Sequence, residues 1–125
     1  MPKHVLIVED QGTTRAMIRS AVEAIEGVTT VEASTGFEAL KLLPRYRFDL
    51  IITDINMPDI NGLELIGFVK GDARYREIPL IIVSTEATEE DRRRGMSLGA
   101  SAYLVKPFQP SELQEAAKRL LADRP

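Results

Sequence analysis

Five polar residues share one placement in the sequence, because each lies at the carboxyl end of a short, mostly apolar run. They are Glu9, Asp10, Asp54, Ser84 and Lys106, at the ends of the runs 5–8, 50–53, 80–83 and 102–105. A single acid at such a position is usually a solvated turn residue. Three carboxylates, a hydroxyl and an ammonium group with the same placement indicate a site, provided that the runs lie next to one another.

The chemistry available to this group is that of phosphoryl transfer. Carboxylates brought together repel one another, which raises at least one pKa unless a cation intervenes. An all-oxygen ligand set suits Mg²⁺, which is commonly held by one or two carboxylates plus a phosphate. Lys106 adds a positive charge and Ser84 a hydroxyl donor, and phosphoryl transfer depends mainly on positioning and charge neutralisation. Asp54 is the predicted nucleophile, because an aspartate can carry a phosphoryl group as an acyl phosphate.

The apolar runs are typical of strands buried on both faces of a parallel sheet, because they are short, β-branched and without alternation. Ligands of such sheets bind outside the carboxyl ends of the strands, so the runs would deliver the polar residues to one edge. Helical patterns alternate with the strands. Five βα units make an open, doubly wound α/β sheet with helices on both faces, and a length of 125 residues excludes an eight-stranded barrel.

The expected elements follow from periodicity and from turn residues. The expected strands cover about 4–9, 28–33, 49–54, a segment opened by Pro79, and 101–106. The expected helices cover about 13–26 and 36–43, a segment around 65–69, a segment after Thr88, and a last helix from Ser111.

Capping residues set the predicted helix ends. Thr13 and Thr88 are the predicted N-caps of the first and fourth helices, and Ser111 with Gln114 forms a predicted capping box in the last one. Gly27 is predicted to close the first helix as its C′ residue. Gly95 in the interior of the fourth helix costs about 1 kcal/mol relative to alanine, so this helix is expected to be marginal.

The composition limits the class of protein. The chain of 125 residues has a formal net charge of −3 and a pI near 5.2, which argues against a sequence-independent nucleic-acid binder, because that class needs a basic face. The sequence shows neither a membrane-spanning segment nor the apolar core of a signal peptide. It contains no cysteine, which favours a cytoplasmic location. We expect one domain over residues 1–125.

Five dispersed motifs, agreeing in order and spacing, give the sequence a family resemblance. They are Val5–Asp10, Leu50–Pro58 with its D-x-x-M-P pattern, Asn61-Gly62, Ser84, and Lys106-Pro107-Phe108. Together they resemble the receiver domain of two-component response regulators over essentially the whole chain, and most closely the single-domain chemotaxis regulators of the CheY type. The resemblance implies a flavodoxin-like (βα)5 three-layer sandwich whose parallel five-stranded sheet has the strand order 2-1-3-4-5.

The resemblance implies roles for the residues that would meet the phosphoryl group. Asp54 is similar to the phosphoacceptor of the family. Asp10, Asp54 and the backbone carbonyl of Asn56 correspond to direct Mg²⁺ ligands, with Glu9 acting through water. The family often has two aspartates where this chain has Glu9-Asp10, which affects the outer-sphere geometry but not the site. Lys106 corresponds to the phosphate-binding lysine, and the Lys106–Pro107 peptide bond is expected to be cis.

Four residues have implied roles in switching and in signal lifetime. Ser84 corresponds to the switch hydroxyl and Tyr103 to the aromatic switch residue, although a tyrosine in this position is also typical of a half-buried core aromatic. Asn56 and Glu86 lie two residues after Asp54 and Ser84. Both are placed to line the path of a hydrolytic water, and the alternative for Glu86 is a solvated loop acid without a role.

The expected function is a phosphorylation-activated signalling switch rather than an enzyme. The expected phosphodonor is a histidine kinase, and the expected readout is a downstream protein bound through the fourth helix, fifth strand and last helix. Neither nucleic acid nor a membrane is an expected partner, and we expect a monomer or weak dimer. Chemotaxis or a related two-component pathway is the expected context.

Three alternatives remain open at this point. The chain could be a receiver module from a larger response regulator or a hybrid kinase. A flavodoxin-like cofactor binder would hold a phosphate at the first βα loop, where Glu9-Asp10 would repel it. A phosphatase with an aspartyl nucleophile usually has a second acid two residues after that nucleophile, and Asn56 occupies this position.

Overall fold

The computed structural model describes residues 2–124 and contains one parallel sheet of five strands. The strands are β1 (Lys3–Val8), β2 (Val28–Ala33), β3 (Leu50–Asp54), β4 (Leu80–Ser84) and β5 (Ala102–Val105). Their order in the sheet is β2-β1-β3-β4-β5, as predicted. All four neighbouring pairs are parallel, so the carboxyl ends of the strands meet at one edge.

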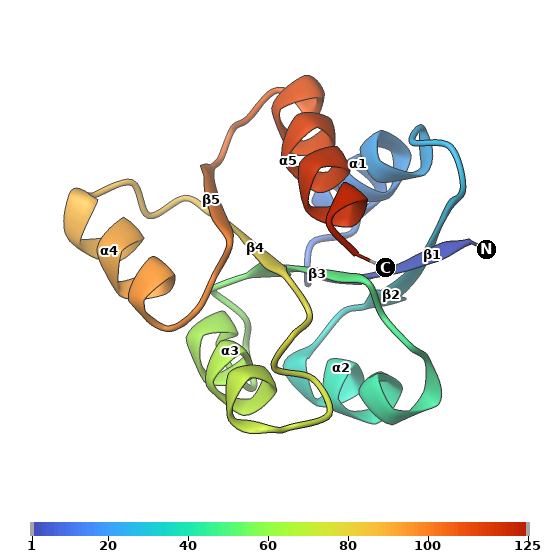
Figure 1. Cartoon of the computed structure of the whole chain (residues 1–125). Helices are drawn as coiled ribbons and strands as arrows, with labels where there is room; N and C mark the ends of the chain where they lie inside the picture. Colours follow the sequence, from blue (N-terminus) through green and yellow to red (C-terminus); the bar gives the residue numbers. More distant parts are fainter. Residues whose placement is uncertain (1, 125) are drawn as a thin grey trace.

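Five helices cover the two faces of the sheet. They are α1 (Gly12–Glu23), α2 (Gly36–Leu42, continued by a 3₁₀ turn at Leu43–Arg45), α3 (Gly62–Gly71), α4 (Glu89–Ser97) and α5 (Pro110–Ala122). Figure 1 shows α1 and α5 together on one face, and α2 and α3 on the other with α4 beside them. The three-layer α/β architecture expected from the sequence is therefore confirmed.

The hydrophobic core consists of two clusters, one on each face of the sheet. Successive residues of a strand point to opposite faces, so Leu6 and Val8 belong to one cluster and Val5 and Ile7 to the other. Every residue of β3 and β4 is buried. This double-sided burial explains why the central strands read as continuous apolar runs.

The first helix differs from its prediction at both ends. The N-cap of α1 is Gln11, and Thr13 lies inside the helix, so the predicted Thr13 cap is wrong. The helix ends at Glu23, about three residues early, with Ala24 as the C-cap. Gly27 adopts φ +81° in the turn before β2. It provides the left-handed conformation that a turn needs, but it is not the residue that ends the helix.

The last helix also begins earlier than predicted. Its N-cap is Gln109, and Pro110 occupies the first turn, where proline has no backbone N–H to lose. The backbone N–H of Gln109 donates to Glu112 Oε1 at 2.9 Å, so the predicted Ser111–Gln114 box is wrong. Gln114 instead donates through Nε2 to the carbonyl of Ala21 at 3.0 Å and ties α5 to α1.

The N-cap of α4 is Thr88, as predicted, and its hydroxyl accepts from the backbone N–H of Asp91 at 3.1 Å. Within residues 2–124, no helix has the length and apolar character needed to cross a bilayer.

Candidate functional site

Three carboxylates meet at the carboxyl edge of the sheet. Glu9 and Asp10 follow β1, and Asp54 ends β3, the strand paired with β1. Each of the three offers a carboxylate oxygen, and these oxygens lie within 4.8 Å of one another. Glu9 is fully buried, Asp54 is 6% exposed and Asp10 is exposed. An all-oxygen cluster that is open to solvent on one side fits a hard divalent cation that keeps some of its waters.

Lys106 lies between the two buried carboxylates. Its Nζ is 2.8 Å from Glu9 Oε1 and 3.0 Å from Asp54 Oδ2, and its backbone N–H is held by the carbonyl of Ser84 at 2.8 Å. Burial alone would lower the pKa of Lys106, but the hydrogen bonds that its ammonium group donates to Glu9 and Asp54 raise this pKa above its usual value. The ammonium group therefore remains charged and supplies the positive charge that this carboxylate pair requires.

Glu9 is held in place by several backbone contacts. Its Oε2 accepts from the N–H of Gln11 at 3.2 Å, and Arg15 Nη1 donates to its carbonyl oxygen at 2.9 Å. Arg15 is itself paired with Glu32 of β2 at 3.1 Å. Burial raises the pKa of Glu9, and the contact with Lys106 offsets this only in part. Burial thus destabilises the charged form of Glu9, and its ionisation depends on the Lys106 ammonium beside it.

Ser84 and Tyr103 are connected through the backbone of Glu86. Ser84 Oγ accepts from the N–H of Glu86 at 3.0 Å, and the Tyr103 hydroxyl donates to the carbonyl of Glu86 at 2.7 Å. Both side chains are buried, and burial is the main cause that raises the pKa of Tyr103. The two predicted switch residues thus bond to the backbone of the same residue, Glu86. A movement of Ser84 can therefore be passed to Tyr103 through Glu86.

The fourth helix, α4, packs against Tyr103 at a glycine. Gly95 is the one buried residue among those described in α4, and a Cβ there would lie 2.6 Å from Ile82 Cδ1 and 3.3 Å from the Tyr103 ring. Glycine at position 95 is therefore explained by packing, which helix propensity does not reveal. The absence of a side chain lets the helix backbone approach Ile82 and Tyr103 closely. A helix held by so little buried surface is easily displaced.

The loop between β3 and α3, residues 55–61, is fixed at both ends. The Gly62 N–H donates to the carbonyl of Ile55 at 2.8 Å. Asp59 accepts from the N–H groups of Gly36 and Phe37 at 3.1 and 2.9 Å, and the bond from Phe37 is the main cause that lowers the Asp59 pKa. These contacts anchor the loop that carries Asn56, whose N–H donates to Asp54 Oδ1 at 3.2 Å.

Replacing Gly62 by alanine is expected to destabilise the domain by about 3 kcal/mol, because the added Cβ would overlap the backbone carbonyl of Asp54, which cannot move as a flexible side chain can. Gly67→Ala in the same helix is the matched control. Nothing lies within 4 Å of its Cβ position, so it should stabilise the domain by about 0.5–1 kcal/mol. Urea unfolding of both variants measures the difference, and similar free energies of unfolding would refute the close approach at Gly62.

Comparison with known proteins identifies the family. Residues 5–118 match the model of the response regulator receiver domain. The chain belongs to this family. Receiver domains typically bind Mg²⁺ at an acidic pocket, and Glu9, Asp10 and Asp54 form an acidic cluster here.

Receiver proteins of similar length are among the relatives of this chain. It is 38% identical over 123 residues to the polar-differentiation response regulator DivK of Brucella anthropi, covering 98% of this chain and 99% of the relative. It is 36% identical to chemotaxis protein CheY1 of Helicobacter pylori, with 94% and 95% covered. The structure of chemotaxis response regulator CheY4 of Vibrio cholerae matches with a TM-score of 0.88 at 33% identity, over 96% of this chain and 99% of that chain.

The predicted site residues lie at or just beyond the carboxyl ends of the strands, except Tyr103, which lies within β5 and reaches this edge through its hydroxyl. The members are Glu9, Asp10, Asp54, Asn56, Ser84, Glu86, Tyr103 and Lys106. The Lys106–Pro107 bond is cis, as the resemblance implied. Two supporting residues were not predicted, Arg15 and Asp59. No sequence pattern connects Asp59 to Gly36, 23 positions away, and the arginine looked like any exposed helical charge.

Magnesium binding to the receiver should depend on Asp10, the exposed member of the carboxylate cluster. Titration of Mg²⁺, followed by amide chemical shifts, is expected to show weak saturable changes near the ends of β1 and β3, and these changes should disappear in Asp10→Ala. Preferential tight binding of Zn²⁺ would contradict an all-oxygen site.

Proposed function

We propose that this receiver domain accepts a phosphoryl group from the phosphohistidine of a histidine kinase onto Asp54. The observation that carries the proposal is the Lys106 ammonium 3.0 Å from the Asp54 carboxylate, next to the oxygen cluster formed with Glu9 and Asp10. A carboxylate oxygen of Asp54 attacks phosphorus while the P–N bond to the imidazole breaks. The products are an aspartyl acyl phosphate and a free histidine on the kinase.

The chain supplies charge neutralisation around the transferred group. Lys106 pairs with the phosphoryl oxygens, and Ser84 donates its hydroxyl to one of them. A Mg²⁺ ion held by Asp10, Asp54 and the carbonyl of Asn56, with Glu9 in its outer shell, would add the second positive charge. The domain promotes its own phosphorylation and dephosphorylation in this scheme but has no other substrate to turn over.

The signal then passes from Ser84 to the α4–β5–α5 face. When Ser84 Oγ turns to the phosphoryl group, it leaves the N–H of Glu86. The Tyr103 hydroxyl is bound to the carbonyl of the same residue, and the Tyr103 ring lies under Gly95 of α4. The added charge thus biases an existing equilibrium between two arrangements of this face, to which a downstream protein binds.

The biological context is proposed at the level that the relatives support. Two relatives with nearly equal sequence identity to this chain are named for different processes, one for polar differentiation and the other for chemotaxis. We therefore propose two-component signalling, with chemotaxis as one candidate pathway. We also propose that residues 1–125 form one receiver domain that works as a monomer or weak dimer, with no direct nucleic-acid or membrane partner. A cytoplasmic location stays a prediction.

The proposed response is tested by amide spectra of the domain with acetyl phosphate and Mg²⁺. We expect shifts at the strand ends and throughout residues 84–105, and no such shifts with acetyl phosphate alone. Changes confined to residues around Asp54 would show that phosphorylation does not reach the α4–β5–α5 face.

The lifetime of the phosphorylated state should depend on the side chain at 56. Asn56 and Glu86 are polar and can orient a water for in-line attack on the acyl phosphate, so we expect decay within seconds to minutes. Asn56→Arg should lengthen the lifetime without preventing phosphorylation, because the bulky cation blocks that water. Decay after removal of the phosphodonor measures the effect, and an unchanged rate in both Asn56→Arg and Glu86→Ala would leave the lifetime argument without support.

A further inference from the structure

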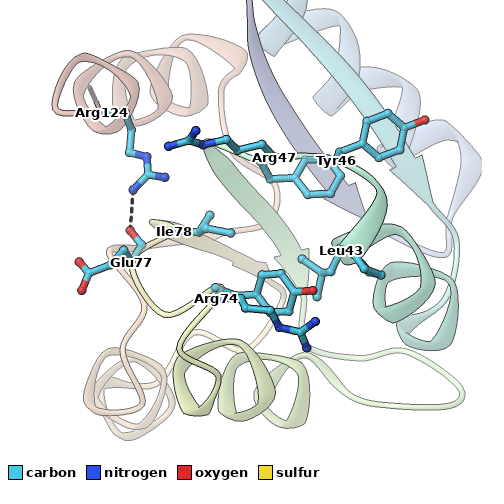
Figure 2. A pocket seen from close by; sticks show the side chains of 10 residues that line it. Leu43, Tyr46, Arg47, Arg74, Glu77, Ile78 and Arg124 are labelled. Atoms are coloured by element: carbon cyan, nitrogen blue, oxygen red, sulfur yellow. Dashed lines mark hydrogen bonds between the residues drawn. The ribbon is translucent and has the colours of Figure 1, made fainter.

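A pocket lies at the amino ends of the strands, the edge opposite to Asp54. This pocket has a volume of about 480 Å³ and is formed by the segments before β3 and β4 together with the end of the chain after α5 (Figure 2). We call it the amino-edge pocket. Its lining includes Tyr46, Arg47, Arg74, Tyr75, Glu77 and Arg124. The volume is within the range of sites that hold small molecules.

Arginine is the main charged residue type of the amino-edge pocket, although the whole chain has a net charge of −3. Three arginines and one glutamate line it, and Figure 2 shows the carboxylate of Glu77 turned outward while its carbonyl faces Arg124. Arg74 is already paired with Asp72 at 2.9 Å. Arg124 has a distant partner in Asp49 at 4.0 Å. The free charge of the pocket therefore comes from Arg47, and Arg124 adds guanidinium donors that suit an anionic ligand.

These two arginines have unused donors. Arg124 Nη1 donates to the carbonyl of Glu77 at 2.9 Å, but its Nε is buried without a hydrogen bond, and Asp49 Oδ1 is 4.0 Å away. The other oxygen of Asp49 accepts from the N–H of His4. Within the described part of the chain, Arg47 forms no hydrogen bond or ion pair, and its guanidinium points toward the Arg124 side of the pocket (Figure 2). A buried unpaired donor costs stability that a bound anion would recover.

Flat side-chain surfaces complete the amino-edge pocket. Tyr46 is 43% exposed and packs with a tilt against Phe48 at 5.4 Å between ring centroids. On the other side, the Arg74 guanidinium covers the Tyr75 ring at 4.7 Å, and Tyr75 is only 7% exposed. The pair with Asp72 holds this guanidinium, so this side of the pocket presents the flat face of Arg74. An aromatic ring on one side and a planar guanidinium on the other suit a planar ring.

We propose that the amino-edge pocket binds a nucleoside phosphate. The phosphate group would lie between the guanidinium groups of Arg47 and Arg124, and the base would pack against Tyr46 and the flat face of Arg74. Guanidinium forks match phosphate geometry, and aromatic side chains match the base. This binding does not depend on the phosphoryl transfer proposed for Asp54, because no residue is shared between the two sites.

Three probes separate the contributions of ring and phosphate. Amide spectra of the full chain, recorded without divalent cations, are titrated with ADP, with inorganic pyrophosphate and with adenosine. We expect saturable shifts at Arg47 and residues 74–78, with ADP binding at least about tenfold more tightly than pyrophosphate or adenosine. Arg47→Ala should weaken ADP binding about tenfold or more, because a charge-assisted contact to phosphate is lost. Arg93→Ala, which removes an exposed arginine of α4, is the matched control and should bind as the wild type does.

Each remaining outcome overturns the proposal. Absence of saturable shifts with ADP would remove the site, and equal affinities for ADP and pyrophosphate would refute the nucleotide assignment. Equal losses in Arg47→Ala and Arg93→Ala would reduce the effect to general charge. Because Arg47 is exposed, its replacement should leave the fold intact, and the unshifted amides of β1 and β3 verify this in the same spectra.

Discussion

Asp54→Asn is expected to abolish phosphorylation, because the amide lacks the anionic oxygen that attacks phosphorus. The fold should persist and its free energy of unfolding should not fall, since the change removes one carboxylate from the repulsive cluster with Glu9 and Asp10. Intact mass after incubation with acetyl phosphate and Mg²⁺ measures the loss, and thermal unfolding measures the stability.

Asp123→Asn is the matched control for that experiment. Asp123 is the exposed C-cap residue of α5 and does not belong to the carboxylate cluster. Phosphorylation of this variant should proceed as in the wild type. Incorporation at the wild-type level in Asp54→Asn would show that Asp54 is not the acceptor.

Lys106→Ala should have the second largest effect, first on stability. The change leaves Glu9 and Asp54 buried without their ammonium partner, and breaking a buried ion pair costs about 3 kcal/mol or more. Mg²⁺ should restore part of the loss, because it supplies positive charge to the same carboxylates. Lys118→Ala on the exposed face of α5 is the control and should change the unfolding free energy little.

The loss in Lys106→Ala should depend on pH with a defined sign. Burial already holds the pKa of Glu9 above its usual value, and removing Lys106 raises it further. A carboxyl group whose pKa is higher in the folded state binds more protons there than in the unfolded state. Stability then falls as the pH rises through the interval between the two values and is regained at lower pH. Urea unfolding at several pH values from weakly acid to neutral checks this, and a loss that is constant or grows toward acid would contradict it.

The same variant separates phosphorylation from signalling. Phosphoryl transfer should continue more slowly in the presence of Mg²⁺, while the amide shifts at α4 and β5 should fall, because the ammonium that pairs with the phosphoryl group is absent. A phosphorylated Lys106→Ala domain with the complete wild-type shifts would remove Lys106 from the switch.

Much of the architecture was predictable because the apolar residues of the strands follow the pattern of their burial. The central strands β3 and β4 are buried on both faces and therefore lack alternation, and a parallel sheet brings their carboxyl ends to one edge. That rule alone assembles Glu9, Asp54 and Lys106 from three distant segments. The residue types then limit the chemistry, since oxygen ligands beside an ammonium group suit a phosphoryl group.

The helix ends and the supporting contacts were less predictable for physical reasons. Thr13 and Ser111 are good capping residues, but both helices begin two residues earlier, with Gln11 and Gln109 as N-caps. In α5, Pro110 fits the first turn and Glu112 accepts from the N–H of Gln109. Helix propensity alone marks Gly95 as destabilising for α4, whereas the structure shows that a side chain there would crowd Tyr103. Contacts of this kind depend on the distance between elements, which periodicity does not encode.

The most direct test of the central claim locates the phosphoryl group chemically. Borohydride reduces an acyl phosphate to an alcohol, so a phosphorylated aspartate becomes homoserine and can be identified by peptide mass spectrometry. After treatment with acetyl phosphate and Mg²⁺, we expect homoserine at position 54, with Asp10 and Asp59 unchanged. Homoserine at another acidic position, or phosphate on a hydroxyl that resists borohydride, would contradict it.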